Sequence, residues 1–185
     1  MSMRKDRTRA ELADFARLVV RAGYLNRAYV QVEVGNFVRA EVADESEADD
    51  LTQQLIAVAE SELQVEQQSW PARTDNDALA DTLADLKTQN FLVLEYCQDH
   101  FDATGELKAH PGVIGIVFFT ETDVWHAVSE GMLELKVWHA DTSNVVEADP
   151  ELALVLDTLS RHGLTARFDE GRIEISVTWR RRHSA

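Results

Sequence analysis

The feature that most constrains this chain is a change in the spacing of its apolar residues near residue 90. Before that point, apolar residues recur three or four positions apart, which is the period of an amphipathic helix. After it, short runs are apolar throughout or alternate apolar with polar residues, as strands do. The sequence therefore predicts an α+β protein whose N-terminal helices pack with a sheet.

Two helices are predicted at the start of the chain. The first spans residues 8–23, and the second follows a capping residue, Asn26, and continues to about Val42. A strand is the alternative for the second, because AYVQVEV also alternates with a period of two. A helix is favoured because Phe37 and Val38 continue the helical spacing.

Two more helices are predicted before residue 90. One begins at Ser46 and ends near Ser69, and the other begins at Thr74, which has capping-box spacing to Asp77. The residues expected on the buried face of the longer helix are Leu51, Leu55, Val58, Ala59 and Leu63.

Five strands are predicted in the second half, in the order β-β-α-β-α-β-β, and they should form a mostly antiparallel sheet. Asp169-Glu170-Gly171 is expected to be the tight turn that joins the last two strands. Thr120 or Thr122 is expected to cap the first of the two intervening helices. The predicted strands are residues 91–97, 112–119, 132–139, 165–168 and 172–179.

The chain is long enough for one core with a helical attachment, because it has 185 residues and 45% of them are hydrophobic. We expect a helical region over residues 1–70 and an α+β domain over residues 71–185, an arrangement compatible with packing as one unit.

Charge is distributed unevenly in this chain, whose net charge is −15. Residues 1–42 hold 8 basic and 5 acidic residues, whereas residues 43–106 hold 2 basic and 16 acidic residues. Because an acidic middle repels phosphate backbones, we expect no nucleic-acid partner. The alternative is a nucleic-acid contact through Arg180, Arg181 and Arg182, but three terminal arginines are a weak signal.

The sequence also bears on compartment and cofactors. It has one cysteine, so it forms no internal disulfide, and its longest apolar run, VIGIVFF, is far shorter than the about 20 residues of a membrane span. Glu11, Asp14 and Arg17 interrupt the apolar residues at the N-terminus, which argues against a signal peptide. We expect a cytoplasmic protein with no membrane partner and, since nucleotide-binding motifs are absent, no cofactor.

The stretch VLEYCQDHFDATGE holds the most suggestive group of polar residues. Cys97 and His100 have the spacing of half a zinc site, and Asp99 is a third candidate ligand. A second ligand pair is missing nearby, and the stretch lacks the regularly spaced oxygen ligands of an EF-hand. The alternative is a polar loop in which Gly105 turns the chain.

Cys97 and His100 are also candidates for a thiol–imidazole pair. The acidic neighbours Asp99 and Asp102 would raise the pKa of the thiol, which disfavours the reactive thiolate. A lone cysteine at the end of a strand is ordinarily a small buried residue. We therefore expect no catalytic residue at this position.

A second group of candidates lies in the predicted helix after residue 120 and the strand that follows it. Asp123, Trp125 and His126 with Trp138 form a candidate interaction patch if the helix packs on that strand. The structural alternatives are that Asp123 caps the helix, that His126 is solvated and that the tryptophans belong to the core.

Three segments together resemble the bacterial domain-of-unknown-function family 6891. They are Trp70 followed by TDNDALADTLADL, then GIVFFTETDVWHAV with LELKV after it, and LSRHGLTARFDEGRIEISVTWRRR. The likeness spans roughly residues 70–182 and implies no activity, since the family is uncharacterised. It carries over four polar candidates, which are Asp75, Asp77, Cys97 and Asp123.

The chain departs from the pattern of this family at two places. It keeps only Cys97 where relatives have a cysteine-rich stretch, and Thr122-Asp123-Val124-Trp125 stands where a Gln-Asp-x-Glu run would fall. A thiol or metal site in relatives would therefore be reduced here. We expect a non-catalytic binding or regulatory module that acts through protein–protein contacts, with a protein partner or by self-association. The alternative is a metal-binding or thiol-dependent enzyme that uses Cys97 and His100.

Overall fold

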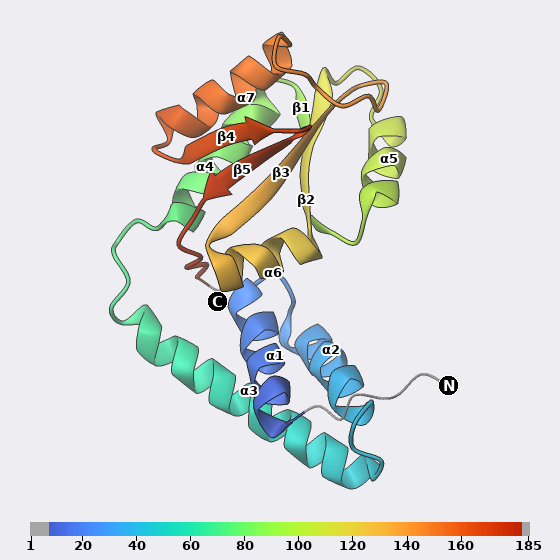
Figure 1. Ribbon diagram of the computed structural model, residues 1–185, viewed down its shortest axis with the longest axis vertical. Coiled ribbons are helices and arrows are strands. Elements are labelled where there is room, and N and C mark those ends of the chain that lie inside the picture. Colours follow the sequence, from blue (N-terminus) through green and yellow to red (C-terminus); the bar gives the residue numbers. More distant parts are fainter. Residues whose placement is uncertain (1–7, 183–185) are drawn as a thin grey trace. The chain divides into compact units, whose positions relative to one another are not determined.

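The computed structural model describes residues 8–182, which form two compact units (Figure 1). Residues 8–71 and 181–182 make up the helical unit, and residues 72–180 make up the sheet unit. Within the described residues there are seven helices and five strands, which confirms the predicted α+β class.

The helical unit consists of α1 (Arg9–Ala22), α2 (Arg27–Arg39) and α3 (Glu45–Gln67). The predicted cap of α2 is confirmed, because the side chain of Asn26 accepts a hydrogen bond from the backbone of Tyr29. Ser46 is wrong as the start of α3, since the carboxylate of Asp44 accepts the backbone N–H of Glu47 and begins the helix earlier. An acidic cap is favoured at this end because it faces the positive pole of the helix dipole.

One hydrogen bond and two ion pairs join α1 to α3 and show that these helices are parallel. Arg9 donates to Gln54, Arg17 pairs with Glu62 at 2.7 Å, and Arg21 pairs with Glu66. Every pair joins residues 45 positions apart, which means that the two helices run in the same direction with a constant register. The Glu62 contact is bidentate, because Nε and Nη2 of Arg17 each donate to one carboxylate oxygen.

The pairs between α2 and α3 run in the opposite sense. Arg27 pairs with Glu60 at 2.9 Å and Arg39 pairs with Asp49 at 3.0 Å, so α2 and α3 are antiparallel. The uneven charge of the sequence therefore has a structural basis, since basic residues of the first two helices pair with acids of the third.

The core of the helical unit is a single apolar cluster built by all three helices. It includes the Phe15 and Phe37 rings, which stack with centroids 3.9 Å apart. Val58 is wrong as a predicted core residue, because it is 45% exposed and lies outside the apolar cluster. The buried positions of α3 are Ala48, Thr52, Leu55, Ile56, Ala59 and Leu63.

The sheet unit contains one sheet with the strand order β1-β2-β3-β5-β4. β1 and β2 are parallel and the remaining neighbours are antiparallel, in agreement with the predicted mostly antiparallel sheet. Glu170 and Gly171 both have positive φ, as the predicted two-residue turn between β4 and β5 requires. The bounds are β1 (Phe91–Cys97), β2 (Gly115–Thr120), β3 (Met132–His139), β4 (Thr165–Asp169) and β5 (Arg172–Ser176).

A helix that the sequence analysis did not predict, α5 (His100–Ala109), connects β1 to β2. The predicted polar loop turned by Gly105 is therefore wrong, and so is the predicted element order, which joined these strands directly. Parallel neighbours need a crossover connection, and α5 supplies it. The sequence gives no amphipathic pattern for this helix, because only two of its side chains, Ala103 and Leu107, are buried.

The sheet lies between helices on its two faces (Figure 1). α4 (Asp75–Thr88) and α7 (Pro150–Arg161) pack on one face, and α5 packs on the opposite face against β1 and β2. β2 lies where both faces are covered, and its residues from Gly115 to Phe119 are all buried. α6 (Glu121–Glu130) packs mainly on β3.

The start of α4 holds the segment that follows β5. Thr74 and Asp77 form the predicted capping box, while the side chain of Asp75 accepts the backbone N–H of Thr178 at 2.7 Å. Asn76 accepts the backbone N–H of Arg180. The Thr-Asp-x-Asp pattern is therefore explained by backbone hydrogen bonds.

Replacing Thr74 by alanine should lower the free energy of unfolding by about 1 kcal/mol, because an N-terminal backbone donor of α4 loses its acceptor. Thr88→Ala is the matched control. Thr88 lies at the other end of α4, and its hydroxyl donates to the carbonyl oxygen of Asp85 in the same helix. Urea unfolding measures both, and equal losses for the two variants would contradict the capping role.

Asp85 of α4 accepts a hydrogen bond from His162 at 2.8 Å and pairs with Arg161 at 3.4 Å. The hydrogen bond from His162, followed by the nearby positive charges, lowers the pKa of Asp85 below its ordinary value of 3.8. This carboxylate therefore contributes stability above its unfolded pKa, and the contribution is lost as pH falls through its folded pKa.

Asp85→Asn should accordingly be less stable than the natural protein at pH 6, and the difference should shrink as the pH is lowered below 4. Thermal unfolding across this pH range checks the prediction. A difference that stays constant or widens on acidification would contradict it.

Candidate functional site

Cys97 lies inside the sheet unit and is 7% exposed. Its Sγ is 3.5 Å from the carbonyl oxygen of Phe119, and its neighbours include Ile116 and Phe118. Burial, followed by the negative charge of Asp102, raises the pKa of this thiol to about 11. The thiolate needed for nucleophilic chemistry is therefore scarce at neutral pH.

Asp99 and His100, the other two metal candidates, occupy the start of α5. The carboxylate of Asp99 accepts the backbone N–H groups of Phe101 at 2.7 Å and Asp102 at 3.2 Å, so it caps the helix. His100 is exposed, and its ring lies 4.1 Å from that of Phe101. Within residues 8–182, no three His, Cys, Asp or Glu side chains are placed to hold a metal ion together. A metal site at these residues stays a prediction.

Asp123 links α6 to the sheet. It forms a capping box with Thr120, and its carboxylate also pairs with Lys136 of β3 at 2.6 Å. Its side chain is only 6% exposed, so burial strengthens the interaction with the ammonium group. Among the predicted interaction residues, Asp123 therefore has a well-defined structural role, and Trp125 and His126 are half-buried on the same helix.

Trp138 packs beneath α5. Its ring meets Phe118 edge-on, with centroids 4.6 Å apart and planes at 72°, in the cluster that contains Ala103 and Leu107. The described contact of this tryptophan is therefore part of a core on the α5 face of the sheet.

Beyond α5, the same face of the sheet carries a charged network. By the alternation of side chains along a strand, Glu134 and Lys136 share the face of Trp138, whereas Leu133 and Leu135 point to the opposite face. Lys136 and Arg172 are cross-strand partners, and so are Glu134 and Glu174. Residues of like charge therefore lie directly opposite each other. The attractive contacts are between diagonal neighbours on adjacent strands, such as Arg172 and Glu134 at 3.7 Å, and between neighbours on the same strand.

No local sequence pattern indicated this network. The alternation of Arg172 and Glu174 on a wet face was visible in the last strand, but the partners depend on the register with β3 and β4. Arg167 pairs with Glu174 and Asp169 with Arg172, so the charges of three strands are mutually engaged. It is a half-buried, ion-paired sheet face.

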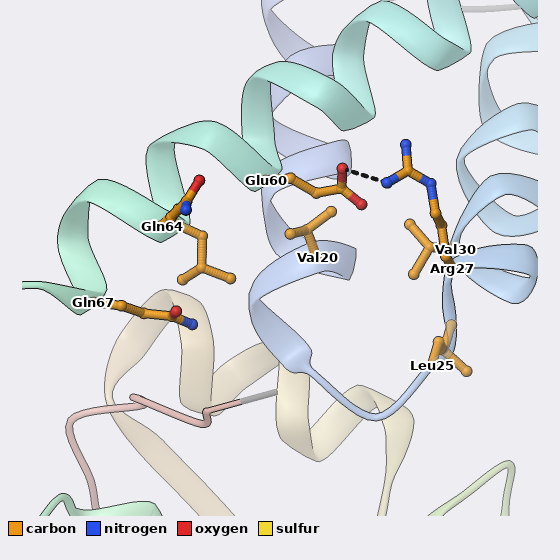
Figure 2. Close-up of a pocket in the computed structure, with 8 residues that line it drawn as sticks. Val20, Leu25, Arg27, Val30, Glu60, Gln64 and Gln67 are labelled. Carbon is orange, nitrogen blue, oxygen red and sulfur yellow. Dashed lines mark hydrogen bonds and ion pairs between the residues drawn. The ribbon is translucent and has the colours of Figure 1, made fainter. Parts of the chain in front are cut away.

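A hollow of about 280 Å³ lies in the helical unit (Figure 2). Its apolar lining comes from all three helices and the α1–α2 turn, and Arg27 and Glu60 meet across it from α2 and α3. Gln64 and Gln67 of α3 complete the rim. Because the lining residues are scattered over the sequence, no local motif indicated it.

The C-terminal arginines are engaged within their own units. The guanidinium of Arg181 lies 3.8 Å from the centre of the Tyr24 ring, and its Nε donates to the carbonyl oxygen of Gly23. Arg182 donates to the carbonyl oxygen of Pro71. Arg180 contributes its backbone N–H to Asn76. These contacts give the arginine cluster a structural role.

These features define a two-unit α+β protein whose polar candidates largely serve caps, ion pairs and core contacts. Within residues 8–182, no helix combines the length and apolar character needed to cross a membrane. The chain belongs to the family described as Domain of unknown function (DUF6891), whose model matches residues 5–183. The match extends the likeness to the N-terminal helices. No curated protein and no solved structure gives a significant match.

Cys97 should resist thiol reagents in the folded protein at pH 8, because burial and its raised pKa suppress the thiolate. The matched variant is Cys97→Ser with Lys108→Cys, which moves the single thiol to an exposed position of α5. Colorimetric labelling should be about 100-fold slower for the natural protein than for this variant, and should become equal in urea. Equally fast labelling of both folded proteins would contradict the assignment.

Proposed function

We propose that this protein is a non-catalytic protein-binding module that associates with a second copy of itself through the middle of α3. The observation that carries the proposal is that every exposed α3 residue from Gln53 to Val65 is uncharged. This is unusual on a helix with seven acidic residues and no basic ones. Five of these residues lie on one side of the helix, and we call them the outer strip: Gln54, Ala57, Val58, Ser61 and Val65.

The absence of charge favours this strip as a contact surface. Interface cores are depleted in charged residues, because charges lose their hydration when the surface is covered. The whole chain carries a net charge of −15, so two copies repel each other at most other approaches. Beside the strip, Glu60 and Glu62 are already paired with Arg27 and Arg17.

The spacing of the strip favours a helix as its partner. Val58 and Val65 are seven residues apart, at 45% and 64% exposure, and Leu51 continues the series one heptad earlier. Gln54 and Ser61 fall between them, so the pattern follows the two alternating positions of a coiled-coil seam. Branched valines at such positions suit a two-stranded pairing, which supports α3 of a second copy as the occupant.

The size of the strip predicts a weak association. From Leu51 to Val65 the helix rises by about 21 Å, and with a helix diameter of about 10 Å the strip covers about 200 Å². A standard interface covers about 800 Å² per partner. We therefore expect a dissociation constant weaker than about 1 µM, with dimers formed only at high concentration.

Sedimentation equilibrium over a wide concentration range tests this function. The double variant Val58→Glu/Val65→Glu should weaken association at least about tenfold, because each dimer would bury several like charges. Val32→Glu is the matched control, since Val32 is a 55% exposed valine on α2, outside the strip. A natural protein that stays monomeric throughout, or a double variant that dimerises normally, would overturn the proposal.

A further inference from the structure

The floor of the hollow in the helical unit is apolar and preformed. Val20 of α1, Val30 of α2 and Leu63 of α3 are at most 6% exposed, and half-buried Leu25 of the α1–α2 turn lies beside them. Their backbones belong to three ion-paired helices, so the floor is held in place without a ligand. An apolar group that binds here would be transferred from water to an apolar surface that is already formed.

The rim of the hollow is polar but carries no net charge. Arg27 and Glu60 neutralise each other at 2.9 Å, and the remaining rim residues, Gln64 and Gln67, are neutral amides (Figure 2). A glutamine amide donates two hydrogen bonds and also accepts, which matches the N–H and C=O of a peptide group. A ligand with a charged end would meet no unpaired opposite charge among these residues.

A second hollow, of about 530 Å³, lies beside the first in the seam between α2 and α3, and Arg27 lines both. The second hollow adds three further glutamines, Gln31, Gln53 and Gln54, and one exposed acid, Asp50. From Asp50 to Gln67 the seam follows about 25 Å of α3. An extended chain of about seven residues has this length.

From this lining we infer that the groove binds an extended peptide segment of a partner protein, which places one bulky apolar side chain in the hollow. The glutamines would then bond the backbone of the segment, while the floor selects the anchor side chain. The hollow alone lies just below the about 300–1,000 Å³ of small-molecule pockets, which suits a single side chain better than a whole cofactor.

The anchor of this inference is separate from the dimer contact, because the first hollow and the outer strip share no residue, although Gln54 and Ala57 of the strip also line the second hollow. The Val58→Glu/Val65→Glu variant leaves Val20, Val30 and Leu63 unchanged. Peptide binding should therefore persist in that variant, and either proposal can fail without the other.

The test is an NMR titration of the full-length protein with the blocked heptapeptide acetyl-GGSLSGG-amide. Saturable shifts are expected at the methyl groups of Val30 and Leu63 and at the side-chain amides of Gln64 and Gln67. Comparison peptides with glycine or glutamate in place of leucine should bind at least about tenfold more weakly, because they lose the apolar anchor.

Two variants locate the site. Gln64→Ala/Gln67→Ala should weaken the leucine peptide about three- to tenfold, since backbone hydrogen bonds are lost. Gln68→Ala is the matched control, because Gln68 is an exposed glutamine just after α3 and outside the hollow. An effect equal to that of the control would overturn the inference.

The remaining outcomes are also decisive. Shifts that fail to saturate, or that map away from the hollow, would overturn the inference. If 3-methyl-1-butanol, which carries the side chain without peptide groups, bound as tightly as the heptapeptide, the site would be one for small apolar molecules. Preferential binding of the leucine peptide in the hollow supports a peptide site.

Discussion

The sheet unit depends on the complete burial of β2. A strand whose residues from Gly115 to Phe119 are all buried needs cover on both faces, and the chain must supply helices on each side. α4 and α7 serve one face, while α5 serves the other only over β1 and β2. Beyond α5, that second face carries the ion-paired side chains of β3, β4 and β5, and Asp123 of α6 joins them through Lys136.

The helical unit follows a different principle, in which charge sets the register and apolar packing supplies the cohesion. The constant separation of 45 residues in the α1–α3 pairs fixes one alignment among the several that apolar contact alone would permit. Each surface pair contributes little stability. Together with the α2–α3 pairs, they engage four of the seven acids of α3 beside the outer strip, which itself carries no charge.

Local signals predicted much of this fold, whereas the candidate sites depend on contacts between distant residues. Caps such as Asn26 and Thr120 and the turn at Glu170 act within a few residues, so the sequence shows them directly. α5 gave no such signal beyond Asp99, because Gly105 interrupts it and Phe101 is 70% exposed. Val58 fitted a helical stripe, but the positions of α1 and α2 decided which side of α3 is buried. The hollow and the charged network likewise depend on residues brought together by packing.

The return of Arg181 to the helical unit has a consequence for synthesis. α1, α2 and α3 are translated before the sheet unit, yet the guanidinium that lies over Tyr24 and bonds the turn at Gly23 belongs to Arg181, which follows the sheet unit in the chain. The helical unit is therefore completed only after the whole sheet unit has been translated. Translation that ends before Arg181 would leave the helical unit without the contacts to Tyr24 and Gly23.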